Sequence, residues 1–282
     1  DGEDSETKKQ MRVGCGAPVE VVSYPVREHH NNSIDLDLKD EFNFLCVAQW
    51  GIRKNLENTI KWFMEEFKDD EIGLVVKSNI SKNSTPDRED CKVKLEESLQ
   101  RYKDAKCSVY LLHGEMSDEE IDAIYKHPKI KAIVSATHGE GFGLPLFEAA
   151  YNALPVVAPG WSGHMDFLYG PVKDKKTKKV KNKPLFAKVD YSLKHVQRDA
   201  VWKDILVKDA MWCFPLERDF KKKIRKVYTD TGMYKSWANS LSEHLRNEHS
   251  LPKVLDKMLK VLIPEKWLVK PGWLGAGDGV RQ

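Results

Sequence analysis

Between residues 42 and 160, short apolar runs alternate with segments whose hydrophobic residues recur at a helical period. The runs lie at 42–50, 72–78, 107–114, 130–136 and 154–160. The first segment between runs places Leu56, Ile60, Phe63 and Phe67 on one helical face. Continuous apolar runs are typical of strands buried on both faces, so the pattern predicts a parallel sheet with helices on both sides.

This pattern divides the chain into three parts. We expect an α/β, Rossmann-like doubly wound domain over residues 42–200. Residues 1–41 lack the alternation, apart from a short strand expected at 18–26, and we interpret them as a linker-like segment. Residues 201–282 show helical patterns and are expected to form a helical C-terminal extension.

Composition narrows the class of protein. The chain has 282 residues, of which 41% are hydrophobic and 32% charged, as is ordinary for a soluble globular protein. A net charge of +3 gives no general argument for nucleic-acid binding, and no apolar run reaches the roughly 18 residues that predict a transmembrane segment. The five cysteines are scattered, without a Cys-x-x-Cys pair, which favours free thiols in a reducing compartment and a cytoplasmic location.

One lysine-rich stretch is open to two interpretations. Residues 171–184 hold seven lysines and one aspartate. A mobile, solvated surface loop is the favoured interpretation, because no aromatic residues are interleaved to stack on bases. A surface for a phosphate-rich acceptor is the alternative.

The stretch 135–163, SATHGEGFGLPLFEAAYNALPVVAPGWSG, combines glycines with two glutamates. It follows an expected strand and runs into an expected helix, so it lies at the carboxyl edge of the sheet, where open α/β folds bind ligands. Glycines let the backbone approach a ligand closely, and the free N–H groups at a helix start attract anions. Glu140 and Glu148 offer carboxylates to hydroxyl groups. The combination suits a nucleotide sugar, with ribose, diphosphate and sugar in a row.

The segments HGEGFGLPLFEAA and LPVVAPGWSGHMDFL resemble the donor-site signature of retaining GT-B glycosyltransferases, family four in particular. VAQWGIRKNLENTI and YLLHGEMSDEEIDAIY resemble two further segments of that family more loosely. The resemblance implies that the Rossmann-like domain is a GT-B C-terminal domain. It also implies transfer of a sugar, with retention at the anomeric carbon, from a nucleotide-sugar donor.

Roles for individual residues follow from the same resemblance. The implied catalytic residues are Glu140, which contacts the donor sugar, and Lys54, which holds the donor diphosphate. Glu148 matches the glutamate that binds the ribose hydroxyls. For His138, packing and orientation of the substrate are both open. The implied donor-binding residues are Arg53, Gln49, His138, Phe142, Gly143, Leu144 and Glu148.

The sequence departs from the family pattern at several positions. Gln49 stands where the family has an arginine, so one phosphate-binding charge is missing, and Arg53 is a candidate to supply it. Asp166 replaces the usual glutamate after the glycine turn. No Asp-x-Asp triplet is present in the expected Rossmann-like domain to hold a metal between phosphates, so we expect no essential divalent ion, no metal-binding residues and no cofactor.

A GT-B enzyme has two Rossmann-like domains, and residues 11–30 resemble its interdomain segment. We therefore expect a donor-binding half whose N-terminal GT-B domain is absent or supplied by a partner chain. We expect this half to be inactive in transfer when alone. The alternatives are a non-catalytic binding or assembly module, and a sugar-nucleotide epimerase or phosphorylase of the same fold. The sequence leaves the base, the sugar and the acceptor open.

Overall fold

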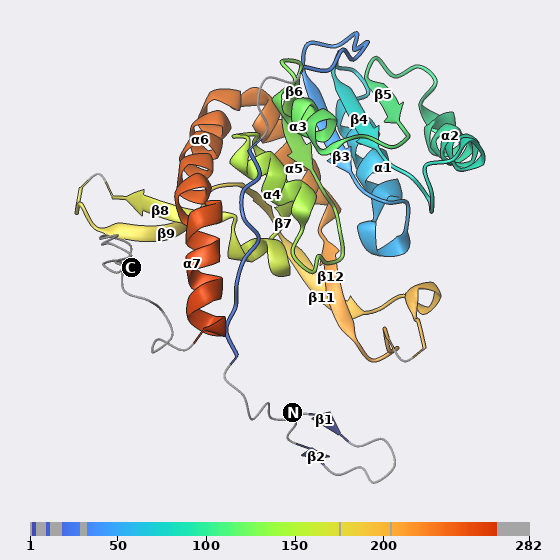
Figure 1. Ribbon diagram of the computed structural model, residues 1–282. Helices are drawn as coiled ribbons and strands as arrows, with labels where there is room; N and C mark the ends of the chain where they lie inside the picture. Colours follow the sequence, from blue (N-terminus) through green and yellow to red (C-terminus); the bar gives the residue numbers. More distant parts are fainter. Residues whose placement is uncertain are drawn as a thin grey trace, which may run out of the picture. The chain divides into compact units, whose positions relative to one another are not determined.

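Six parallel strands form the central sheet of the computed structural model (Figure 1). Their order is β10-β7-β6-β3-β4-β5. The strands are β3 (Asn43–Val47), β4 (Gly73–Lys77), β5 (Ser108–Leu112), β6 (Ile130–Val134), β7 (Val156–Pro159) and β10 (Ala187–Val189). The structure describes residues 2–3, 10–11, 19–28, 33–174, 176–203 and 205–263.

Alternate residues of each strand point into two hydrophobic cores. On β3, Phe44 and Cys46 belong to one core and Leu45 to the other. The first core is covered by α1 (Leu56–Phe67) and α5 (Glu217–Thr229), and the second by α3 (Asp118–Lys126) and α4 (Leu144–Tyr151). Because both faces are covered, the strands read as continuous apolar runs.

Three further helices complete the described chain. α2 (Thr85–Leu99) packs beside α1, and Ser84 caps it by accepting a hydrogen bond from the Asp87 N–H. α6 (Thr231–Glu248) contributes Tyr234 to the first core and Leu241 to the second. α7 (Leu251–Leu262) is amphipathic and largely exposed. Among the described residues, no helix is both long and apolar enough to cross a bilayer.

Short elements make up the rest of the described structure. The remaining strands are β1 (Gly2–Glu3), β2 (Gln10–Met11), β8 (Tyr169–Lys173), β9 (Val180–Pro184), β11 (Tyr191–His195) and β12 (Met211–Pro215). The 3₁₀ turns are η1 (Ile52–Lys54), η2 (Gln100–Tyr102), η3 (Gly163–Asp166) and η4 (Arg198–Ala200). β8 pairs with β9, and β11 with β12, as antiparallel hairpins outside the central sheet.

The predicted fold class is confirmed, because all five predicted runs are parallel strands of one sheet. The strand expected at 18–26 is wrong over residues 19–26, which have no regular structure. The lysine-rich stretch is the β8–β9 hairpin, where Asp174 accepts hydrogen bonds from the Lys176 and Thr177 N–H groups at the turn.

The chain forms two units, residues 26–247 and residues 1–25 with 248–282. The domain boundaries expected near 41 and 200 stay predictions. α5 and α6, which follow residue 200, bury apolar residues such as Phe220 and Leu245 in the two cores. Residues 264–282 of the expected helical extension, and most of residues 1–18 of the expected linker, lie outside the described residues.

Candidate donor-binding site

The loop after β3 and the loop after β6 are tied together at the carboxyl edge of the sheet. The Arg53 carbonyl accepts hydrogen bonds from the His138 N–H at 2.8 Å and the Thr137 hydroxyl at 3.1 Å. The Asn55 side-chain amide donates to the Ala136 carbonyl at 2.9 Å. Asn55 itself adopts a left-handed conformation, with φ of 54°, where η1 ends and α1 begins. The two loops therefore present their side chains from fixed positions.

Two cations from the first loop meet one carboxylate from the second. Lys54 Nζ lies 2.7 Å from both carboxylate oxygens of Glu140, and Arg53 Nη1 lies 3.3 Å from Glu140 Oε2. The side chains of Lys54 and Glu140 are only 18% and 10% exposed, which strengthens their attraction relative to a surface pair. One positive charge of this charge cluster, Arg53, Lys54 and Glu140, remains uncompensated. The arrangement suits an anionic ligand.

Behind the charge cluster, a glycine lets the start of η3 pack against the backbone of the loop that carries Glu140. A Cβ atom at Gly163 would lie 1.9 Å from the Gly141 carbonyl oxygen, so only glycine fits there. The Gly163 N–H donates to the Glu140 carbonyl at 3.1 Å. The Ser162 hydroxyl lies 2.6 Å from that same carbonyl and 2.9 Å from the Glu140 N–H. The loop that carries Glu140 is thus held along its backbone by the start of η3.

Gly143 ends this loop and begins α4. Its φ of 93° is in the left-handed region that favours glycine. Pro145 has no N–H, so the donors left at the helix start are the N–H groups of Gly143 and Leu144. Leu144 is 39% exposed. These two donors and the helix dipole are suited to an anionic group.

A hollow of about 300 Å³ opens beside the charge cluster, and we call it the edge hollow. It is lined by Val47, Ala48, Gln49, Lys54, Lys77, Ser78, Asn79, Asn83, Ile121 and Pro145. Most of these residues end β3 and β4 or directly follow them, as expected for a ligand site at the carboxyl edge of a parallel sheet.

Lys77 adds a second cation to the edge hollow. Its ammonium donates to the Gly114 carbonyl at 2.5 Å, and it forms no ion pair within the part of the chain that the structure describes. Burial lowers the pKa of Lys77 below its ordinary value, because the charged form loses solvation. An anion in the hollow would stabilise that charged form. The sequence analysis did not assign Lys77 to the site, although a lysine at the end of a buried strand was the available signal.

The two predicted glutamates have different hydrogen-bond partners. Glu140 belongs to the charge cluster, whereas Glu148 Oε2 accepts a hydrogen bond from the Tyr125 hydroxyl of α3 at 3.1 Å. Burial raises the pKa of Glu148 above its ordinary value, and the Tyr125 hydrogen bond opposes this rise. Pro145, in the first turn of α4, lines the edge hollow. Glu148 lies further along the same helix and is not among the residues that line the hollow.

The other predicted donor-binding residues have clear structural contacts. His138 is buried, lies 2.6 Å from the Cys213 carbonyl through Nδ1, and stacks on the Trp212 ring at 4.9 Å. Burial lowers the pKa of His138, which favours the neutral ring. Phe142 packs on Phe147 and Phe167 in the second core. Gln49 lines the edge hollow, and its side-chain amide donates a hydrogen bond to the Ile80 carbonyl at 2.8 Å.

Residues 30–168 match the family model described as "Glycosyl transferases group 1". The match includes the charge cluster, the edge hollow and the start of α4. No curated protein matches the sequence.

Solved structures with a similar fold include Anabaena HepE in complex with UDP and glucose (TM-score 0.55, 12% identity). Others are the Escherichia coli trehalose-6-phosphate protein bound with UDP-2-fluoro glucose (0.53, 9%) and Staphylococcus aureus TarM in a complex that includes UDP (0.52, 16%). The likenesses cover 80%, 80% and 87% of this chain, but 49%, 45% and 39% of the neighbours. The chain thus has the Rossmann-like fold of GT-B structures and spans less than half the length of these three.

Proposed function

We propose that this chain is the nucleotide-sugar-binding half of a retaining glycosyltransferase, with a UDP sugar as the first donor to test. The observation that carries the proposal is the charge cluster beside the edge hollow. Lys54 and Arg53 offer two cations to a diphosphate, and Glu140 beside them offers a carboxylate to sugar hydroxyls. The match to the group 1 family model and the UDP complexes among the structural neighbours support it.

The mechanism we propose is electrostatic. As the bond from the sugar to the diphosphate breaks, negative charge develops on the departing phosphate oxygen. Lys54, Arg53 and the N–H groups at the start of α4 would stabilise that charge from fixed positions. Lys77 would supply the charge that Gln49 does not. Glu140 would orient the sugar through its hydroxyls, and Glu148 would accept hydrogen bonds from the ribose.

We further propose that the acceptor is held by a second domain or a partner chain. Support comes from the neighbours, whose chains are more than twice as long as the region that they share with this one. Alignment of two reactants between two walls can contribute about 7 to 11 kcal/mol to lowering a barrier. Transfer therefore requires both halves in this proposal, whereas donor binding requires only this one.

Donor binding is tested directly by calorimetry and thermal unfolding with UDP, UDP-glucose, UDP-N-acetylglucosamine, GDP-mannose and ADP-glucose. A ligand at 100 times its dissociation constant stabilises a protein by about 2.7 kcal/mol, so the melting temperature should rise measurably. We expect a UDP compound to give the largest rise. If none of the five binds at millimolar concentration, the proposal is wrong and an assembly module becomes the better interpretation.

The two glutamates should respond differently to neutralisation. Glu148→Gln is expected to weaken UDP and UDP-sugar binding equally, by about 1 to 3 kcal/mol for the lost charge-assisted hydrogen bonds. Glu140→Gln should weaken the UDP sugar selectively, because it removes the sugar contact and frees Lys54 and Arg53 for the phosphates. Calorimetry with both ligands measures the contrast. Equal losses for both ligands in both variants would refute the assigned roles.

The raised pKa of Glu148 gives this test a pH dependence. A protonated carboxyl accepts fewer hydrogen bonds, so UDP binding should weaken as the pH falls through that raised pKa. The acidic loss should be absent in Glu148→Gln.

A further inference from the structure

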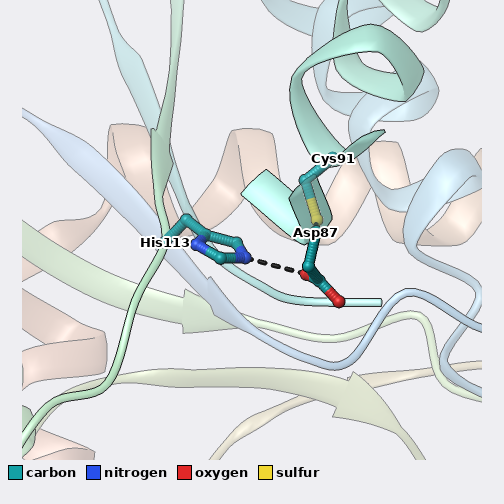
Figure 2. A group of neighbouring side chains, drawn as sticks. All are labelled: Asp87, Cys91 and His113. Atoms are coloured by element: carbon teal, nitrogen blue, oxygen red, sulfur yellow. Dashed lines mark hydrogen bonds and ion pairs between the residues drawn. The ribbon is translucent and has the colours of Figure 1, made fainter. Parts of the chain in front are cut away.

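A second polar cluster lies behind the loop that lines the edge hollow. Asp87 and Cys91 stand one turn apart on α2, and His113 follows β5 (Figure 2). Their ligand atoms, a carboxylate oxygen, a thiol sulfur and an imidazole nitrogen, all lie within 4.8 Å of one another. Sequence analysis did not find this group, because Asp-x-x-x-Cys alone is common and His113 is distant along the chain.

The three side chains converge in a buried place. His113 Nε2 lies 2.8 Å from Asp87 Oδ1, and Cys91 Sγ lies 3.6 Å from that same oxygen. The side chains of His113 and Asp87 are 3% and 7% exposed, and Cys91 is fully buried. Figure 2 shows the imidazole of His113 directed at the carboxylate of Asp87.

We propose that Asp87, Cys91 and His113 bind a divalent metal ion of the zinc class. Zinc takes nitrogen, sulfur and oxygen ligands at about 2.0 to 2.3 Å, so neighbouring ligand atoms lie about 3 to 4 Å apart. The oxygen–sulfur separation falls in that range, and the oxygen–nitrogen separation needs a shift of a few tenths of an ångström. One carboxylate and one thiolate also balance the charge of a divalent ion, as a buried site requires.

The carboxylate is already oriented by groups around it. Asp87 Oδ2 accepts hydrogen bonds from the Ser81 and Lys82 N–H groups at 2.7 and 2.9 Å, and Oδ1 accepts one from the Ile80 N–H at 3.0 Å. Such outer contacts fix the direction of a metal ligand and raise metal affinity. Oδ1 is also the oxygen that lies 2.8 Å from His113 Nε2 and 3.6 Å from Cys91 Sγ, so the ion would sit beside it.

The ion would fix the position of the residues that form one wall of the edge hollow. The segment that Asp87 holds, residues 80–82, lies between Asn79 and Asn83, which both line that hollow. The Ile80 carbonyl also accepts a hydrogen bond from Gln49 at 2.8 Å. A metal ion would therefore join the start of α2 to the end of β5 and hold this wall in place. This inference does not depend on the proposed function, because it rests on ligand atoms outside the hollow.

The test uses Co²⁺ as a spectroscopic substitute for zinc. The full chain is stripped with a chelator and titrated with Co²⁺, and we expect one ion per chain with the thiolate-to-cobalt absorption that only a cysteine ligand gives. Zn²⁺ should displace the cobalt and abolish this absorption. Proton release into a weak buffer should accompany binding, because the thiol ionises.

Matched variants assign the site. Cys91→Ser should abolish the thiolate absorption and His113→Gln should weaken Co²⁺ binding at least tenfold, whereas Cys107→Ser and His127→Gln should leave both unchanged. Cys15, His29 and His30 lie outside the described residues, and a Cys15→Ser, His29→Gln, His30→Gln variant controls for them. Chelation should lower the melting temperature of the wild type but not of Cys91→Ser.

Two results would overturn the proposal, one from the wild type and one from a variant. If Co²⁺ gives no thiolate absorption, or if that absorption persists in Cys91→Ser, the three residues form a hydrogen-bonded cluster without an ion. Circular dichroism confirms that each variant folds before it is compared.

Discussion

Replacing Gly163 with alanine should displace the loop that carries Glu140, lowering both stability and donor binding. The new methyl group would lie 1.9 Å from the Gly141 carbonyl oxygen and 2.7 Å from its carbon. These are backbone atoms, so no side-chain rotation relieves the clash. Overpacking costs about 1 to 3 kcal/mol, and a backbone clash belongs at the upper end of that range. Urea unfolding and UDP calorimetry on the same samples measure the two losses.

Gly141→Ala is the matched control in the same loop. A Cβ atom there meets nothing within 4 Å, so we expect a change in unfolding free energy within about 0.5 kcal/mol. If Gly163→Ala were as stable as Gly141→Ala and bound UDP as well, the close approach of η3 to the Glu140 loop would not exist in solution.

Lys54→Met should have the largest effect on binding of any single charge removal at the site. It removes the ammonium that lies 2.7 Å from both Glu140 oxygens and leaves Glu140 with Arg53 alone. The net charge of the charge cluster, at the position proposed for the diphosphate, then falls to zero. Loss of a charge-assisted hydrogen bond costs about 1.5 to 3 kcal/mol, which corresponds to roughly ten- to a hundredfold weaker UDP binding.

Lys61→Met supplies the comparison for this prediction. Lys61 is 47% exposed and pairs with Glu65 at 3.9 Å on the surface of α1, so its loss should change stability and binding little. Calorimetry at two salt concentrations adds a second readout, since the wild-type affinity should fall with salt more steeply than that of Lys54→Met. UDP affinity equal to that of the wild type in Lys54→Met would exclude Lys54 from phosphate binding.

The sequence predicted the parts of the fold that local pattern controls. Strands such as β3 and β4 are buried on both faces, so their apolar runs are continuous and easy to recognise. β10 has only three residues, and its position beside β7 depends on long-range pairing. A pattern of local hydrophobicity carries no information about such pairing, and the prediction ended with five strands.

The candidate site shows the same division. The glycines and glutamates of 135–148 were visible in the sequence, as was Lys54. Which side chains meet was not visible, because that depends on how two loops approach in space. Examples are Glu148, which contacts Tyr125 of a neighbouring helix, and Lys77, which enters the edge hollow from β4. The roles of the predicted residues in donor binding stay predictions until the variants are measured.

The hydrogen bonds that His138 and Thr137 donate to the Arg53 carbonyl should influence the thermodynamics of the proposed donor binding. Fixing the backbone of one residue costs about 1 to 2 kcal/mol of conformational entropy. Because these hydrogen bonds form when the chain folds, the loop is already ordered before a ligand binds. Binding of UDP should therefore show a modest entropic penalty and fast association. Removing the hydroxyl tie with Thr137→Val would transfer part of the ordering to the binding step, making binding entropy less favourable while the ligand contacts stay the same.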